Sequence, residues 1–242
     1  IQTCARRIYD GEVESERQQF LWRRSCAGGK RVSTLRQVGA APNRRGTQIS
    51  FQPDTEMFGR RLFAPARLCR LCRSKAFLFR DVTIRWSCDP ALIRAGEETP
   101  ADAVLHFPGG LADSLADELG TNPPLLTPFW AGEAPLPAAA DGSENGKVEW
   151  AVAFLESGAA SLVSYCNTIP TPQGGTHETG LRNALVKGLR AWGDQRSVKK
   201  ASAITAEDVL GMGAIRLSVF IRDPHFQGQT KEKLTTAEAS RL

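Results

Sequence analysis

The chain has 242 residues, of which 41% are hydrophobic and 24% are charged. This balance is ordinary for a globular protein and argues against disorder as the main state, and the length allows one large domain or two modest ones. The net charge of +5 permits a polyanionic partner, such as nucleic acid or a nucleotide, without establishing one.

The first half of the chain is expected to alternate strands and helices. Apolar residues at every second position predict strands, and a helical stripe of leucines ending at Gly120 predicts the last of the helices. The predicted strands cover residues 13–24, 46–54 and 81–89, and the predicted helices cover residues 65–79 and 109–120.

The composition then changes, because residues 121–146 hold five of the 14 prolines of the chain. Proline neither continues a helix nor donates to a strand ladder, so this segment is expected to be a connection. We therefore predict two domains, residues 1–122 and residues 123–242.

The second half is expected to form an α/β layered unit. Alternation predicts a hairpin between residues 147–155 and 161–169, and a strand over residues 214–224. Between them, leucines at helical spacing predict a helix over residues 178–193, and the spacing of Thr205 and Asp208 predicts a capping box at the start of another helix.

The sequence has no apolar run close to the ~18 residues that a membrane span needs, and its first residues lack a signal-peptide core. We expect no membrane contact, and the six cysteines, scattered through the chain instead of clustered as a disulfide framework, favour a reduced, cytoplasmic setting. Cys69 and Cys72 form a C-x-x-C pair, which is either half of a zinc or redox site or two small apolar residues on a helix. The second interpretation is favoured, because a zinc site needs further ligands at recognisable spacing.

Two polar segments are candidates for chemistry. His177 follows two glycines at the start of a predicted helix, where it either contacts a nucleotide or another subunit or, as we favour, closes the turn by hydrogen bonding. Further on, Gly228 allows close backbone approach, Gln229 can donate to an anionic oxygen, and Lys231 is a point charge suited to a phosphate. Such groups can stabilise a transferring phosphoryl group. The alternative is a polar loop with Thr230 as a helix N-cap, and the chemistry alone does not decide between them.

Residues 44–59, 165–185 and 218–234, in this order, resemble the B subunit of bacterial type IIA topoisomerases, of the topoisomerase IV kind more than the gyrase kind. The resemblance implies that residues 1–122 form the C-terminal part of a GHKL-type ATPase α/β sandwich. It also implies that residues 123–242 form a ribosomal-protein-like α/β transducer domain.

The resemblance further implies a nucleotide site for ATP and Mg²⁺. Gly46 and Thr47 match the last glycine box of the ATPase, with the threonine beside the adenine, and Arg17 falls on an arginine at the mouth of the pocket. Gln229 and Lys231 match the transducer loop that reaches the γ-phosphate, so they are the catalytic candidates. The segment from Gly174 to His177 matches a transducer signature with an expected structural role.

The implied activity is the coupling of ATP binding and hydrolysis to DNA strand passage, which decatenates and relaxes DNA. The implied partners are DNA, the A subunit of topoisomerase IV, and a second copy of the B subunit. The family's magnesium-binding asparagine, general-base glutamate, adenine-reading aspartate and glycine-rich lid have no counterpart in these residues. The chain by itself is therefore expected not to turn over ATP.

Two alternatives stay open. The first is a supercoiling subunit of the gyrase type. The second is a module that binds DNA or a partner without nucleotide chemistry. Six basic residues favour this alternative, although they could equally form the solvated face of a helix. These residues are Arg60, Arg61, Arg67, Arg70, Arg73 and Arg80.

Overall fold

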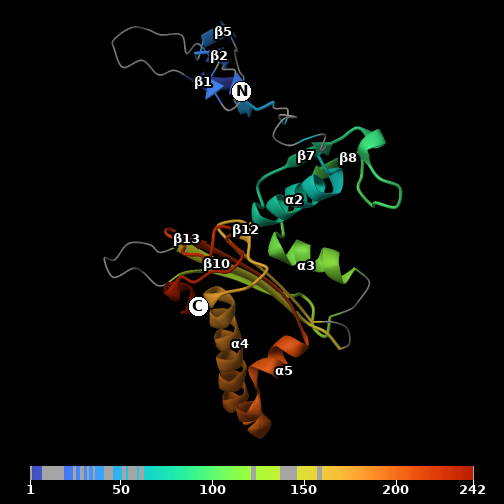
Figure 1. The fold of residues 1–242 in the computed structure, drawn as a ribbon. Helices are drawn as coiled ribbons and strands as arrows, with labels where there is room; N and C mark the ends of the chain where they lie inside the picture. Colours follow the sequence, from blue (N-terminus) through green and yellow to red (C-terminus); the bar gives the residue numbers. More distant parts are fainter. Residues whose placement is uncertain are drawn as a thin grey trace. The chain divides into compact units, whose positions relative to one another are not determined.

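The structure is a computed structural model, and it forms two compact units, Ile1–Phe63 and Ala64–Leu242 (Figure 1). The described residues are 2–6, 19–23, 26–27, 30–31, 33–34, 36–40, 46–50, 53, 59, 63–120, 124–136, 146–156 and 160–241. Their helices and sheets confirm the predicted mixed α/β class.

The first unit contains a four-stranded sheet in the order β5-β2-β1-β6. Antiparallel pairing joins β1 to both β2 and β6. Between β2 and β5 in the sequence, β3 (Cys26–Ala27) and β4 (Lys30–Arg31) form a short antiparallel hairpin. The four strands are β1 (Gln2–Arg6), β2 (Gln19–Arg23), β5 (Arg36–Ala40) and β6 (Gly46–Gln48). The strand predicted over residues 46–54 is therefore shorter than expected.

The second unit begins with helices and a hairpin. Helix α2 (Pro65–Leu78) has Pro65 in its first turn, where the missing N–H removes no helical hydrogen bond. The antiparallel hairpin of β7 (Ile84–Ser87) and β8 (Asp102–Leu105) follows, with the 3₁₀ turn Pro90–Leu92 between its strands. Helix α3 (Leu111–Leu119) then ends at Gly120. Both helices predicted in this part of the chain are confirmed.

A five-stranded sheet in the order β12-β11-β13-β10-β9 forms the centre of this unit. The predicted hairpin is wrong, because β13 (Gly213–Ile221) lies between β10 (Gly146–Phe154) and β11 (Ser161–Cys166). It pairs antiparallel with β10 and parallel with β11. Almost all of β13 is buried, which is the pattern of a strand covered on both faces.

The proline-rich segment is more than a connection. It contains β9 (Trp130–Pro135), which pairs antiparallel with β10 at the edge of the sheet. The other edge is β12 (Ile169–Pro170). Both of these strands carry proline, which is tolerated at a sheet edge because no second neighbour needs its N–H.

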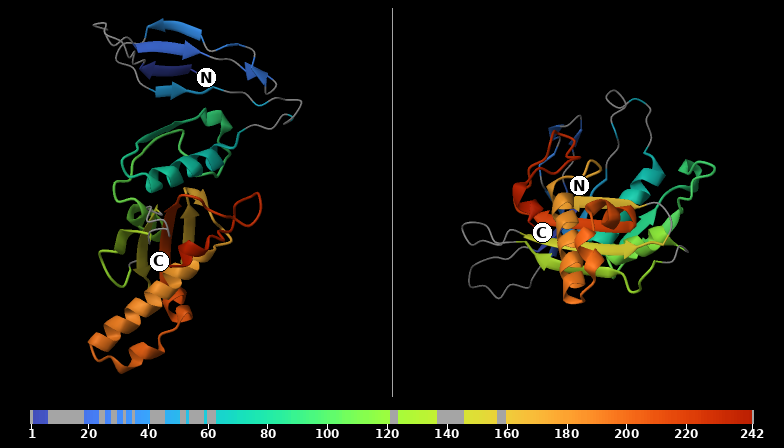
Figure 2. Two further views of the ribbon diagram at one scale, coloured as in Figure 1. Left: turned by 90° about the vertical axis from the view of Figure 1, so that its left-hand side faces the viewer. Right: turned by 90° about the horizontal axis from the view of Figure 1, so that it is seen from below.

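Helices cover both faces of the sheet (Figure 2). On one face, β13 packs through alternate apolar residues against α4 (Thr176–Gln195) and α5 (Ala206–Gly211). Thr205 and Asp208 form the predicted capping box of α5. On the other face, small residues of the sheet pack against Leu111 and Leu115 of α3 and Leu78 of α2.

The core on the α2 and α3 face of the sheet joins side chains that precede residue 122 in the sequence to side chains that follow it. The boundary expected between residues 122 and 123 stays a prediction, since a shared core does not say which segments act as functional domains. Among the described residues, no helix is both long and apolar enough to cross a bilayer.

Candidate functional site

The loop that carries Gln229 and Lys231 follows directly from the central strand. The chain leaves β13 at Ile221 and closes on itself where Phe226 and Leu234 form an antiparallel bridge. The Gln227 amide donates to the Lys233 carbonyl oxygen at 2.9 Å. No helix begins at Thr230, because the next described helical turn is Ala237–Ser240. The alternative of a helix N-cap at Thr230 is therefore wrong.

The tip of this loop is exposed to solvent. Gly228 has φ 79° and Lys231 has φ 58°, so the backbone turns sharply on both sides of Gln229. The Lys231 ammonium lies 5.9 Å from the centroid of the Phe226 ring, which is a loose cation–π contact. Within the described part of the chain, no carboxylate pairs with this ammonium. The charge is therefore available to an anionic ligand.

The base of the loop is held by the two-glycine turn before α4. The Leu234 amide donates to the Gly174 carbonyl oxygen at 3.0 Å, and the Thr176 amide donates to the Leu234 carbonyl oxygen at 3.1 Å. A Cβ built on Gly175 would clash with the Leu234 carbonyl oxygen, and Gly175 has φ 147°. Only glycine fits this close approach.

A side-chain pair extends the same attachment. The Gln173 amide nitrogen Nε2 donates to Glu232 Oε2 at 2.6 Å, and the Gln173 backbone amide donates to the Glu232 carbonyl oxygen at 3.0 Å. This pair was not predicted from the sequence, since no local spacing relates two residues this far apart. Two motifs that are separate in sequence thus form one hydrogen-bonded unit.

Buried polar side chains lie under the two-glycine turn. His177 is fully buried, and its Nε2 shares a hydrogen bond of 3.0 Å with Thr171 Oγ1. Ser164 Oγ lies 2.6 Å from Thr171 Oγ1 and also donates to Glu178 Oε1 at 2.6 Å. Desolvation lowers the pKa of His177 to about 4, so the ring is neutral at neutral pH. The expectation that His177 closes the turn by hydrogen bonding is confirmed.

The other predicted contacts belong to the first unit. Gly46 and Thr47 are residues of β6, where they lie opposite Cys4 and Thr3 of β1. Arg17 lies outside the described residues. The predicted nucleotide contacts are thus divided between two units, and their meeting around one ligand stays a prediction.

The C-x-x-C pair lies on α2, and both thiols are free. Cys69 is buried, and desolvation is the main cause that raises its pKa. In the described part of the chain, no group of three or more His, Cys, Asp or Glu side chains is placed to hold a metal ion.

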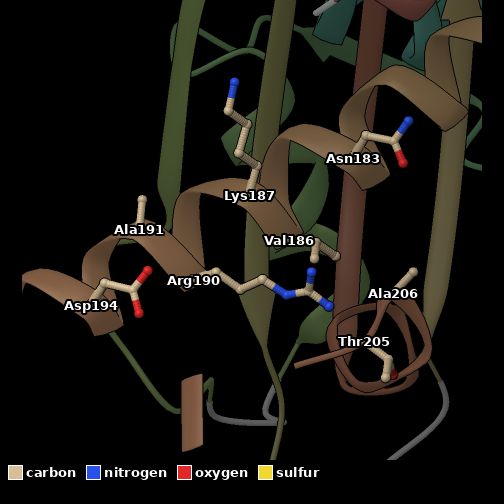
Figure 3. A pocket seen from close by; sticks show the side chains of 8 residues that line it. All are labelled: Asn183, Val186, Lys187, Arg190, Ala191, Asp194, Thr205 and Ala206. Atoms are coloured by element: carbon tan, nitrogen blue, oxygen red, sulfur yellow. The ribbon is translucent and has the colours of Figure 1, made fainter. Parts of the chain in front are cut away.

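A groove of about 640 Å³ lies along α4 and the start of α5 (Figure 3). The Arg190 guanidinium spans it and donates twice to the Ile204 carbonyl oxygen, at 3.0 and 2.6 Å. The predicted nucleotide contacts are not among its described lining residues. These are Asn183, Val186, Lys187, Arg190, Ala191, Asp194, Thr205 and Ala206.

Comparisons with known proteins indicate the family of the chain. The family model described as DNA gyrase B matches residues 114–242, which include the two-glycine turn and the Lys231 loop. The B subunit of DNA topoisomerase 4 from Bartonella bacilliformis is 43% identical over 234 residues, 96% of this chain and 33% of the relative. The corresponding protein of Caulobacter vibrioides is 44% identical over 236 residues, with the same two shares covered.

Solved structures share the fold. The 43K ATPase domain of Thermus thermophilus gyrase B, in complex with an aminocoumarin, matches with a TM-score of 0.71 and 24% identity, over 91% of this chain and 56% of that one. The ATP-binding domain of Francisella tularensis topoisomerase IV matches with a TM-score of 0.63 and 24% identity, over 99% and 59%. These likenesses confirm the predicted α/β fold class.

The chain spans about a third of the length of the curated relatives that it matches. The family model covers more than half of the chain, and the two relatives align with nearly all of it. The chain therefore belongs to the B-subunit family of bacterial type IIA topoisomerases, which includes DNA gyrase B and the B subunit of topoisomerase IV.

Proposed function

We propose that the chain is the ATPase–transducer segment of a DNA topoisomerase IV B subunit, in which ATP binding and hydrolysis drive DNA strand passage. The observation that carries this function is the attachment of the Lys231 loop to the two-glycine turn through Leu234. It fixes both limbs of the loop and leaves the ammonium at an exposed tip without a carboxylate partner among the described residues.

In this proposal Lys231 stabilises the negative charge that develops on the γ-phosphate, and Gln229 donates a hydrogen bond to a phosphate oxygen. A held donor is more effective than a mobile one, because its orientation is fixed before the reaction. Gly46, Thr47 and Arg17 contribute from the first unit, with Thr47 beside the adenine.

ATP reaches phosphoryl-transfer sites as a magnesium complex, in which the ion neutralises phosphate charge. The described residues contain no group of three potential metal ligands. They therefore do not fit a magnesium site by themselves. The roles proposed for Lys231 and Gln229 do not involve the ion.

The test is ATP hydrolysis by a B subunit in which this chain replaces the matching third of the Caulobacter vibrioides relative. Lys231→Ala is expected to lower kcat on the order of 100-fold, as for loss of one charge-stabilising donor. Lys233→Ala is the matched control, because Lys233 is a second lysine of the same loop, and it is expected to change kcat less than about twofold. Equal hydrolysis by both variants would overturn the proposal.

The proposal of topoisomerase IV rather than gyrase follows the two curated relatives described above, which carry the topoisomerase IV name. The proposed partners are accordingly DNA, the A subunit of topoisomerase IV, and a second copy of the B subunit. The grafted B subunit, combined with the A subunit, is expected to unlink catenated circles. ATP-dependent negative supercoiling of relaxed circles would instead assign the gyrase activity.

A second observation concerns DNA contact. Residues 182–204 hold six lysines and arginines and a single acidic residue, Asp194. Arg196, Lys199 and Lys200 at the end of α4 are exposed. By contrast Arg73, one of the six arginines that the alternative of a DNA-binding module would use, is paired with Asp117, and Arg60 and Arg61 lie outside the described residues.

We propose that DNA contacts this basic segment at and after the end of α4. Replacing Lys199 and Lys200 by Gln should weaken duplex binding by the chain and lower the slope of log affinity against log salt by up to about two. Replacing Arg67 and Arg70 of α2 in the same way is the control with equal charge loss. A larger effect of the α2 variant would move the contact to that helix.

A further inference from the structure

Lys75 is a half-buried lysine whose ammonium has an unusual pair of partners. It lies near the end of α2 and donates to the Thr168 carbonyl oxygen at 2.5 Å and to Thr168 Oγ1 at 2.7 Å. Among the described residues, no carboxylate forms an ion pair with it. Burial lowers its pKa. An ammonium that loses hydration without a counter-charge is costly, so the contact with Thr168 calls for an explanation.

The partner is the two-residue turn Asn167–Thr168, which joins β11 to β12. Asn167 has φ 47° and Thr168 has φ 67°. Two consecutive positive φ values are typical of a tight hairpin turn, where asparagine is common. A β-branched threonine seldom adopts this conformation, and such outliers persist only where the surroundings impose them. Lys75 supplies such a restraint, because it binds Thr168 through the backbone and the side chain.

Asn167 connects the turn to the end of the central strand. Its backbone amide donates to the Val219 carbonyl oxygen at 2.9 Å. Its side chain forms a reciprocal pair with Ile221, in which Nδ2 donates to the carbonyl oxygen at 2.7 Å and Oδ1 accepts from the amide at 2.8 Å. Ile221 is the last residue of β13, and the Lys231 loop follows it.

These contacts form a continuous path from α2 through the turn to the base of the loop. We propose that Lys75 is a positioning residue for Lys231, which fixes the end of β13 through Thr168 and Asn167 and so sets where the loop leaves the sheet. This inference rests on the proposed function of Lys231. It adds that α2 and the Lys231 loop act through the Asn167–Thr168 turn.

A purely structural role for Lys75 would have a different signature. In that case, substitution of Lys75 would lower the stability of the whole unit, and amide exchange would increase equally in the loop and in the core. A positioning role predicts a local effect, which is greatest between Ile221 and the Phe226–Leu234 bridge. Hydrogen exchange separates the two, because it reports opening at each amide.

The first experiment compares amide exchange in the chain and its Lys75→Met variant. Met keeps the length of the side chain and removes the donors. The Ile221 and Gln227 amides are expected to exchange about tenfold faster, with Val152 of β10 unchanged. Arg70→Met is the matched control, because Arg70 is an exposed cation of the same helix. Equal acceleration at Val152 would show a structural role and overturn the proposal.

Asn167→Gly provides a second, independent variant. Glycine tolerates the positive φ, so the turn is kept while the side-chain bonds to Ile221 are lost. This variant is expected to accelerate exchange at the same amides as Lys75→Met. If neither variant changes exchange in the loop, the inference is wrong regardless of any effect on hydrolysis.

The second experiment is a double-mutant cycle in the grafted B subunit. Lys75→Met is expected to lower kcat about tenfold and to change the KM for ATP less than about threefold. In the Lys231→Ala background, Lys75→Met should have no further effect, because the residue acts through Lys231. Additive effects would overturn the inference. If Lys231→Ala leaves kcat unchanged, the proposed function fails, which is a result distinct from a failed exchange experiment.

Discussion

Gly175 lies against the backbone of Leu234, and this contact joins the turn before α4 to the loop that carries Lys231. The Leu234 amide and carbonyl oxygen are both used, one by Gly174 and the other by Thr176. The loop is thus held by main-chain hydrogen bonds, whose donors and acceptors remain when a side chain is substituted. The glycine next to them is the position at which the attachment can be disturbed.

Gly175→Ala should destabilise the chain and loosen the loop. The added Cβ meets the Leu234 carbonyl oxygen, and the backbone conformation is unfavourable for alanine. We expect a loss of roughly 1–3 kcal/mol in the free energy of unfolding, measured with urea.

Gly188→Ala is the control for this change. Gly188 lies within α4, and a Cβ there meets no atom within 4 Å. Alanine favours a helix more than glycine does, so the variant should gain about 0.5–1 kcal/mol. If Gly175→Ala and Gly188→Ala shift stability in the same direction, the steric argument for Gly175 is wrong.

The ion pair between Glu118 and Arg216 should stabilise the fold more than the ion pair between Asp117 and Arg73. Arg216 is buried in β13, and Glu118 of α3 is its acidic partner. Glu118→Ala leaves a buried guanidinium without its counter-charge, so we expect a loss of about 2 kcal/mol in the free energy of unfolding, less than for a fully buried pair.

Asp117→Ala is the matched control. Asp117 pairs with Arg73, and both side chains are substantially exposed. Solvent screening should limit its effect to about 1 kcal/mol or less. Urea titration of both variants checks the order, and a larger loss for Asp117→Ala would contradict it.

His177 should make stability depend on pH in a defined window. Its pKa falls from 6.5 in the unfolded chain to about 4 in the folded one. The folded state therefore binds fewer protons between these values, so the stability is complete above pH 6.5 and is lost as the pH falls towards 4. The loss amounts to roughly 3 kcal/mol.

Unfolding of the chain and of His177→Gln at several pH values measures this difference. The variant should show a flatter profile between the two pKa values of His177. Burial raises the pKa of Glu178, whose contribution has the opposite sign, because its stabilisation is complete at low pH and is lost as the pH rises. The contribution of Glu178 is present in both proteins, so it cancels when the profile of His177→Gln is subtracted from that of the unsubstituted chain. Parallel profiles would show that His177 titrates normally.

Local patterns determined much of this protein. The leucine stripes of α3 and α4, Gly120 after α3 and the Thr205–Asp208 capping box all act within a few residues, so the sequence specifies them directly. Segments 44–59, 165–185 and 218–234, taken in order, likewise indicated the family to which the chain belongs.

Only the tertiary structure decided the strand order and the geometry of the loop. Alternation shows which residues of β10 and β11 face a core, but it does not show that β13 separates them, because pairing depends on which strand can be covered on both faces. In the same way Gly175 meets Leu234, and Lys75 meets Thr168, across long stretches of chain. Such contacts are set by the packing of the whole sheet and its helices, which no local spacing encodes.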